Sequence, residues 1–203
     1  MLQSGNAVSE PLALFTVGHS NHPIERFIGL LTRHGIEVLA DVRSTPFSRF
    51  NPQFNRGRLE ASLKETGIRY VFLGDELGAR SKDPAHFEGG KVSYARLATS
   101  APFKRGIEEL LSLARSRHVA MMCAEREPVD CHRTLLVGRE AERTGASITH
   151  ILADGSLERN DATLERLAKQ LKLPQDDLFQ GDADRREQAY EARGKQISPP
   201  ARG

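Results

Sequence analysis

Five short apolar segments, separated by stretches with helical periodicity, constrain the fold of this chain more than any other feature. Each segment is almost continuously apolar instead of alternating with polar residues. Such segments are typical of parallel strands whose two faces are both covered by helices. The predicted strands are residues 12–17, 36–42, 68–73, 119–123 and 148–152.

Between these segments, apolar residues recur at the three- and four-residue spacing of a buried helix face. Ile24, Phe27, Ile28 and Leu31 form the first such pattern, and Gly35 follows where a helix would end. The other helical patterns are those at Leu59 and Leu63, 103–114, 131–143 and 164–171. Strands that alternate with helices predict an α/β fold, a Rossmann-like three-layer sandwich with a mainly parallel five-stranded sheet.

The length of 203 residues fits one domain with short additions at both ends. We expect an N-terminal extension over residues 1–11, a single α/β domain over 12–172 and a charged, flexible tail over 173–203. The tail has few large apolar residues, so it is expected to be solvated, with a short helix around 183–193. Residues 74–100 form a long connection with four glycines, which is typical of a lid or binding loop.

Charge and hydropathy exclude several classes of protein. The formal net charge is only +2, so no strong overall field draws the chain to nucleic acid or to a membrane surface. No apolar run approaches the roughly 20 residues that cross a bilayer, and the first residues lack the pattern of a signal peptide. Two cysteines make no disulfide framework, which indicates a reducing compartment. We therefore expect a cytoplasmic protein without a membrane partner, and no feature specifies an oligomeric state.

Chemically reactive side chains are concentrated just after the predicted strands. His19 and Ser20 follow the first strand, Asp41 and Arg43 the second, and Glu125 the fourth. Because parallel strands point the same way, their carboxyl ends share one edge of the sheet, where ligands bind in open α/β folds. We therefore expect one site that collects these residues.

The segment from Cys123 to Arg133 is the most reactive part of the sequence. It joins a predicted buried strand to a predicted helix and contains Glu125, Cys131 and His132. A helix N-terminus and neighbouring positive charges lower the pKa of a thiol, so Cys131 is a candidate nucleophile or part of an anion cradle. The catalytic candidates are Cys131, Glu125 and His19, and the ligand-binding candidates are Ser20, Asp41, Arg43, Ser48, Arg49, His132 and Arg133.

Each candidate also has a structural interpretation. His19 is as well suited to capping the first helix as to proton transfer. Asp41, at a strand end, is more typical of a turn acid than of a base. For Arg43 the structural alternative is an ion pair with Glu125, and for Cys131 it is the role of a small buried core residue.

The sequence carries no metal or dinucleotide signature, so it predicts no metal site and leaves the cofactor unassigned. A metal site built from Cys123, Cys131, His132 and His19 is disfavoured. The gap between the two cysteines is not the short spacing of zinc knuckles, and adjacent Cys and His side chains rarely bind one ion together. Cys123 is more typical of a core residue than of a reactive one. A redox pair of the two cysteines requires Cα atoms within ~7 Å of each other.

Taken together, the motifs resemble those of one prokaryotic family. They are Thr16-Val-Gly-His-Ser20, Asp41-Val-Arg-Ser-Thr-Pro-Phe-Ser-Arg49, Leu73-Gly74, Leu77-Gly78 and Cys123-Ala-Glu with Cys131-His-Arg133. This set is similar to the family named domain of unknown function 488, over about residues 12–153. The resemblance implies a compact α/β domain and supplies no reaction. It also implies that one site is formed by His19, Ser20, Asp41, Arg43, Ser48, Arg49, Glu125, Cys131, His132 and Arg133.

The main functional hypothesis is an enzyme that binds a phosphate-bearing or otherwise anionic small molecule or nucleotide. Arg43, Arg49 and Arg133 would neutralise the anion, together with N–H groups of the helix after Cys131. Cys131 or Glu125 would act as nucleophile or base, and His19 or His132 would shuttle a proton.

The alternative hypothesis is a nucleic-acid-binding or nucleotide-sensing module without catalysis. The loop over residues 43–58 interleaves arginines with Phe47, Phe50 and Phe54, and aromatic rings of this kind stack exposed bases. The structural explanation, which the residues favour, is that these three rings pack the loop onto the sheet. A sensing domain would hold an effector with the same arginines.

Overall fold

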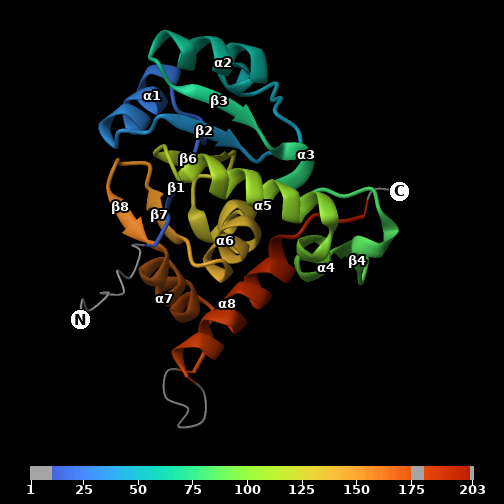
Figure 1. Cartoon of the computed structure of the whole chain (residues 1–203). Coiled ribbons are helices and arrows are strands. Elements are labelled where there is room, and N and C mark those ends of the chain that lie inside the picture. The colour runs from blue at the N-terminus through green and yellow to red at the C-terminus, as the bar shows by residue number, and fades with distance from the viewer. Residues whose placement is uncertain (1–10, 175–180, 202–203) are drawn as a thin grey trace, which may run out of the picture.

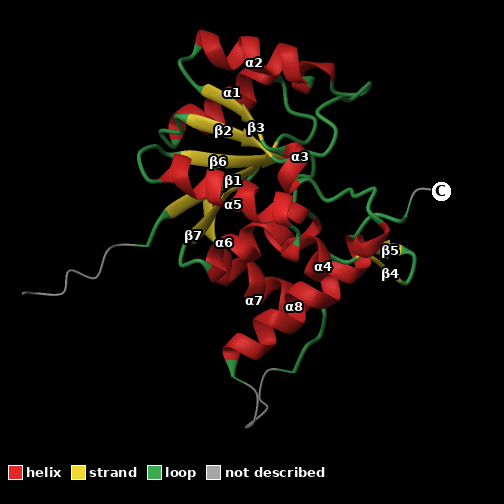
Figure 2. Ribbon diagram, turned by 45° about the vertical axis from the view of Figure 1, so that its right-hand side comes forward, coloured by secondary structure: helices red, strands yellow, loops and turns green. Residues whose placement is uncertain are grey.

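A six-stranded sheet with the order β3-β2-β6-β1-β7-β8 runs through the centre of the molecule (Figures 1 and 2). The computed structural model describes residues 11–174 and 181–201. Strands β1, β2, β3, β6 and β7 are parallel, and β8 pairs with β7 in the antiparallel direction. The strands are β1 Ala13–Gly18, β2 Val38–Asp41, β3 Arg69–Phe72, β6 Val119–Cys123, β7 Ser147–Ile151 and β8 Leu157–Arg159.

The predicted α/β sandwich with a mainly parallel sheet is confirmed, and each of the five predicted strands is present. The sheet has one strand more than expected, the edge strand β8. This strand has only three residues, of which Leu157 and Arg159 are exposed, so it lacks the continuous apolar character that identified the other five. It forms because the chain turns back after β7 through Gly155, whose φ of 89° is the left-handed conformation that favours glycine.

Helices cover both faces of the sheet, as the continuous apolar strands predicted. On one face, helices α1 (Ile24–Arg33) and α2 (Arg56–Glu65) pack against apolar residues of β1, β2 and β6. The opposite face is covered by α5 (Ala101–Ala114), by the segment that ends in α6 (Arg139–Arg143) and by α7 (Asn160–Gln170). In the described part of the chain, no helix combines the length and apolar content needed to cross a membrane.

The long connection expected over residues 74–100 contains short elements rather than an open loop. It begins with helix α3 (Gly74–Leu77), continues through the two-stranded hairpin of β4 (Phe87–Glu88) and β5 (Lys91–Val92), and ends with helix α4 (Tyr94–Thr99). The side chains of Leu77, Val92, Tyr94 and Leu97 are buried. These side chains anchor the connection to the core.

The C-terminal region forms helix α8 (Asp182–Ile197), longer than the short helix predicted there. The expectation that this region is solvated is wrong for one face of the helix, because Ala189 and Tyr190 are buried in the core. The Tyr190 hydroxyl accepts a hydrogen bond from Asn160 at 2.6 Å and donates one to Glu142 at 2.9 Å. The many charged residues of both signs in this region hid the few apolar residues of the buried face from the sequence analysis. The predicted N-terminal extension lies outside the described residues except for Pro11.

Candidate functional site

Three neighbouring strands, β2, β6 and β1, end side by side at the edge of the sheet that carries the reactive residues. The pairing of β1 with β6 continues beyond the strands, since the backbone N–H of His19 donates to the Cys123 carbonyl at 2.9 Å and that of Ser20 donates to Ala124 at 3.0 Å. A Cβ on Gly18 would lie 2.0 Å from the Glu125 carbonyl oxygen. Glycine is therefore required for this close approach.

A cavity of about 730 Å³ opens at this edge of the sheet. Its walls come from the segments that follow β1, β2 and β6, from the segment after α3, from α4, and from the end of α8 with the residues that follow it. The polar and charged lining residues are His19, Ser20, Asn21, Arg43, Ser44, Thr45, Ser48, Asn51, Arg80, Tyr94, Cys123, Glu125, Asp130 and His132. The predicted meeting of the strand ends therefore produces a cavity large enough for a small molecule.

Beneath one wall, a buried network joins the ends of β1, β2 and β3. Arg43 donates from Nε to Asp41 Oδ1 at 2.9 Å and from Nη2 to Asp41 Oδ2 at 2.7 Å. The Tyr70 hydroxyl donates to the same carboxylate at 2.7 Å, and Arg43 Nη2 also donates to the Phe54 carbonyl at 2.8 Å. Asp41 is completely buried and Arg43 nearly so. The ion pair of Arg43 with Glu125, one of the sequence alternatives, is replaced by this pair with Asp41.

His19 belongs to the same network, which holds it neutral. Its Nδ1 donates to the Ser20 carbonyl at 2.8 Å, and its Nε2 accepts from Arg43 Nη1 at 3.2 Å. Burial, followed by the charge of Arg43, lowers the pKa of His19 to about 4. The ring stacks on Phe54 with a centroid distance of 4.2 Å. Both ring nitrogens therefore have hydrogen-bond partners in this structure.

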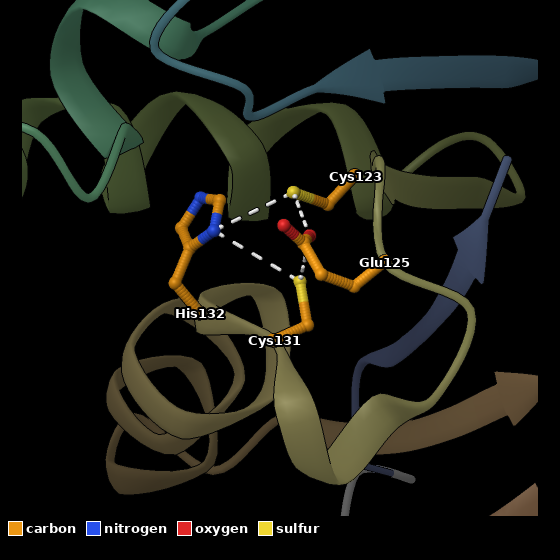
Figure 3. Close-up of side chains that lie close together, drawn as sticks. All are labelled: Cys123, Glu125, Cys131 and His132. Atoms are coloured by element: carbon orange, nitrogen blue, oxygen red, sulfur yellow. Dashed lines mark hydrogen bonds between the residues drawn. The ribbon is translucent and has the colours of Figure 1, made fainter. Parts of the chain in front are cut away.

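The second cluster, formed by Cys123, Glu125, Cys131 and His132, brings four potential ligand atoms together (Figure 3). Glu125 Oε2 lies 2.9 Å from the Cys123 sulfur and 3.0 Å from the Cys131 sulfur. His132 Nδ1 lies 3.5 Å from the Cys123 sulfur and 3.9 Å from that of Cys131. The other ring nitrogen, Nε2, donates to the Val42 carbonyl at 2.9 Å. Glu125 is exposed, while the other three residues are buried.

The two thiols differ in their ionisation. Burial raises the pKa of the Cys123 thiol, and the neighbouring Cys131 sulfur raises it further. Burial opposes ionisation of Cys131 as well, but the hydrogen bond from Cys123 and the charges of Arg133 and His132 hold its pKa well below the usual value. Burial also raises the pKa of Glu125. Contact with Cys131 raises the pKa of His132 despite its burial. Cys131 is thus the more easily ionised of the two thiols.

Arg133 holds the loop between the two cysteines in place. Its guanidinium is fully buried and donates to the carbonyl oxygens of Glu125 at 2.7 Å and Arg126 at 3.1 Å, and to Thr16 Oγ1 at 3.3 Å. The helix predicted from Cys131 begins two residues later, with a π-helical segment Arg133–Gly138 ahead of α6. The Cys131 backbone is extended, and its sulfur accepts the N–H of Arg133 at 3.4 Å. π-Helical turns are frequent at functional sites.

The predicted site residues therefore divide into two groups. His19, Ser20, Arg43, Ser48, Glu125 and His132 line the cavity. Asp41, Cys131 and Arg133 are buried behind its surface, and Arg49 is exposed outside it, with its guanidinium 5.9 Å from the Phe50 ring. The lining residues that the sequence did not single out include Arg80 and Tyr94. Both lie in the connection after β3, where no local pattern marks a side chain as facing the site.

The fold and this cavity define an α/β protein whose cysteine-containing site lies at the carboxyl edge of a parallel sheet. A family model described as Domain of unknown function DUF488 matches residues 23–139, more than half of the chain, and the chain belongs to this family. The matched range includes Asp41 to Arg49 and Cys123 to Arg133 and begins after Ser20. No curated protein and no solved structure matches the chain. Its function therefore has to be argued from the site itself.

Proposed function

We propose that this protein is an enzyme that binds an anionic small molecule, such as a phosphate-bearing compound or a nucleotide, in the cavity at the ends of β1, β2 and β6. One observation carries the proposal. Side chains that can donate hydrogen bonds to an anion (Ser44, Ser48 and Arg80) line the same cavity as the reactive side chains of Cys123, Glu125 and His132. Open α/β proteins bind ligands at this edge of the sheet, and a volume of about 730 Å³ suits a small molecule.

The donor wall would hold the anionic part of the ligand. Ser44 Oγ accepts the N–H of Arg80, and Ser48 Oγ accepts two N–H groups, from Phe50 and Asn51. Because these oxygens already accept hydrogen bonds, their own hydroxyl hydrogens are left to donate to a ligand. Arg80 is exposed on the same cavity and adds a positive charge. Of the three arginines that the sequence assigned to the anion, Arg43 alone lines this cavity.

The opposite part of the cavity would act on the ligand. Cys123, Glu125 and His132 line it, and Glu125 is the exposed member of the group. A carboxylate beside a bound ligand can take and return a proton during the reaction. Glu125 is therefore the group to which we assign proton transfer, in place of His19.

The test is ligand binding combined with turnover. Inorganic phosphate and adenosine monophosphate are titrated into the full chain by calorimetry, and product formation from nucleotides is followed by chromatography. Arg80→Ala should weaken binding about tenfold or more, since it removes a charge-assisted hydrogen bond. The matched control is Arg49→Ala, which removes an exposed arginine outside the cavity and should leave binding unchanged. Glu125→Gln should retain binding and lose turnover. Equal binding by the wild type, Arg80→Ala and Arg49→Ala, or no binding by the wild type, contradicts the proposal.

A second candidate function, binding of single-stranded nucleic acid, is favoured by the loop after β2. The exposed fraction is 64% for Phe47 and 87% for Phe50, while Phe54 is fully buried. The structural explanation of the three rings therefore applies to Phe54 alone. Phe47 also lines the cavity, and the guanidinium of Arg49 lies near the Phe50 ring. Rings exposed in this way can stack on unpaired bases while arginine follows the phosphates.

This candidate is tested with a fluorescent single-stranded oligonucleotide titrated at several salt concentrations. Affinity should fall steeply with salt. Phe47→Ala and Phe50→Ala should each cost about 1–3 kcal/mol of binding free energy. Leu157→Ala, which removes an exposed apolar side chain on β8, is the matched control. Weak binding that is independent of salt removes this candidate.

A further inference from the structure

The cluster of Cys123, Glu125, Cys131 and His132 has the composition of a metal site. Its two sulfurs, one imidazole nitrogen and one carboxylate oxygen all lie within 4.8 Å of one another. Seven residues separate the two cysteines in the sequence, and the turn Pro128–Asp130 brings the second one back beside the end of β6. Soft thiolates combined with imidazole favour Zn²⁺ among the common divalent ions.

The orientation of His132 is an independent observation that points to a ligand. A carbonyl can only accept a hydrogen bond, so the contact with Val42 places the proton of the neutral ring on Nε2. The lone pair of Nδ1 then faces the two sulfurs. Histidines that bind metals usually donate their other ring N–H to a carbonyl or carboxylate, which fixes the ring in the binding orientation.

The two sulfur–nitrogen distances within the cluster fit one tetrahedral ion. The Glu125 carboxylate lies closer to the sulfurs, at 2.9 and 3.0 Å, so it would have to move outward to share the ion with them. Zinc–sulfur bonds of about 2.3 Å and zinc–nitrogen bonds of about 2.0–2.1 Å place sulfur and nitrogen about 3.6 Å apart at a tetrahedral angle. The two observed separations from His132 Nδ1 are 3.5 Å to Cys123 and 3.9 Å to Cys131. Figure 3 shows the side chains pointing toward a common centre, with the Glu125 carboxylate beside both sulfurs.

We propose that Cys123, Cys131 and His132 bind a Zn²⁺ ion, with Glu125 as a fourth, exchangeable ligand. This inference rests on the proposed function, because the ion would face the same cavity and act on the same bound molecule. Three protein ligands and one exchangeable position are the arrangement of catalytic rather than structural zinc sites. Glu125 is the exposed ligand, so water or an oxygen atom of the substrate would enter by displacing its carboxylate.

The experiment measures metal on the full chain. Inductively coupled plasma mass spectrometry should find one zinc ion per chain in the purified protein. Replacement by Co²⁺ should give thiolate-to-metal charge-transfer bands and the intense visible bands of tetrahedral cobalt. Cys123→Ser, Cys131→Ser and His132→Ala should each lose more affinity than the roughly tenfold to hundredfold cost of a second-shell change. Glu125→Gln should retain Co²⁺ with at most about a tenfold loss. Asp130→Asn, which removes another acid that lines the cavity, should bind as the wild type does.

A second measurement applies even where a variant fails to fold. In the wild-type chain, Zn²⁺ should slow the alkylation of both cysteines, and a chelator should restore the rate. Sub-stoichiometric metal, no thiolate band with Co²⁺, or alkylation that is insensitive to zinc overturns the proposal. Formation of a disulfide between Cys123 and Cys131 that zinc does not prevent also overturns it, in favour of a redox pair.

The outcomes separate this inference from the proposed function. A chain that binds zinc but neither phosphate nor adenosine monophosphate retains the metal centre and loses the proposed ligand class. A chain that binds the nucleotide through Arg80 and contains no metal retains the proposed function and loses the metal centre.

Discussion

Two polar clusters meet at the same cavity and differ in how their hydrogen bonds are satisfied. In the network of Asp41, Arg43, His19 and Tyr70, donors face acceptors: the carboxylate receives two guanidinium N–H groups and a hydroxyl. In the cluster of Cys123, Glu125, Cys131 and His132, four atoms that can bind a cation face one another, and the thiol hydrogens are the only donors among them.

The difference teaches how to separate a structural cluster from a reactive one. Buried polar groups in a structural network are paired with partners of opposite character. Acceptors that surround a common point are instead stabilised by a proton or by a cation. Residue type alone does not make this distinction, because each cluster contains a histidine and an acidic residue and has an arginine in it or beside it. Stability measurements can test the distinction directly.

The largest effect is expected from breaking the first network. Arg43→Met keeps much of the side-chain length and leaves the fully buried Asp41 without its counter-charge. Removing one partner of a buried ion pair costs about 3–5 kcal/mol. Denaturant unfolding would measure this loss. Arg49→Met is the matched control, and because Arg49 is exposed it should change the unfolding free energy by about 0.5 kcal/mol or less. A similar effect of both substitutions would mean that the network does not stabilise the fold.

A second satisfied network should reveal itself through pH. His150 accepts a hydrogen bond from Thr16 and donates one to Asn160, and burial lowers its pKa from the usual 6.5 to about 4. The unfolded chain therefore binds a proton between these pH values while the folded chain does not. The contribution of His150 to stability should be complete above pH 6.5 and should fall with pH by up to about 1.4 kcal/mol per unit until pH 4. His19, whose pKa is also about 4, adds a similar contribution in the same range.

The control for this pH dependence is His150→Gln, which has no group that titrates in this range. Its unfolding free energy should depend less steeply on pH between 4 and 6.5 than that of the wild type. Identical slopes for the two proteins would show that His150 is protonated in the folded chain.

A smaller effect is expected at the C-terminal helix. Tyr190→Phe removes a buried hydroxyl that bonds to Asn160 and Glu142 and so joins α8 to the His150 network. The loss should be about 1–3 kcal/mol, because Asn160 and Glu142 lose a partner. Hydrogen exchange of α8 would localise the change. A loss below about 0.5 kcal/mol would mean that packing alone holds the helix.

The sequence predicted those parts of the molecule whose own residues follow a recognisable apolar pattern. Continuous apolar runs identified the five parallel strands, and helical spacing identified the helices on both faces. Strand β8 and the buried face of α8 were missed because a strand of three residues, two of them exposed, and a helix of mixed charge carry no comparable pattern. These elements depend on contacts with residues distant in the sequence, such as the bond of Tyr190 to Glu142.

The candidate site was predictable in its location and less so in its contacts. Parallel strand ends share one edge, so the approach of β1, β2 and β6 followed from the fold class. The sequence analysis did not identify the partner of Arg43, although Asp41 lies two residues away and side chains at this spacing in an extended chain point to the same face. The proximity of Cys123 and Cys131 also depends on a turn that spacing rules for metal sites do not describe.

The smallest effect on stability is expected in the second cluster, and this contrast would sharpen the comparison most. With a chelator present, Cys131→Ser replaces one small buried group by another of similar shape that can still donate to Glu125, at 3.0 Å in the wild type. The unfolding free energy should change by about 1 kcal/mol or less. With zinc present, the wild type should gain stability because the ion binds only the folded chain, and the variant should gain little. If Cys131→Ser, with a chelator present, lowered the unfolding free energy as much as Arg43→Met does, both clusters would serve to stabilise the fold.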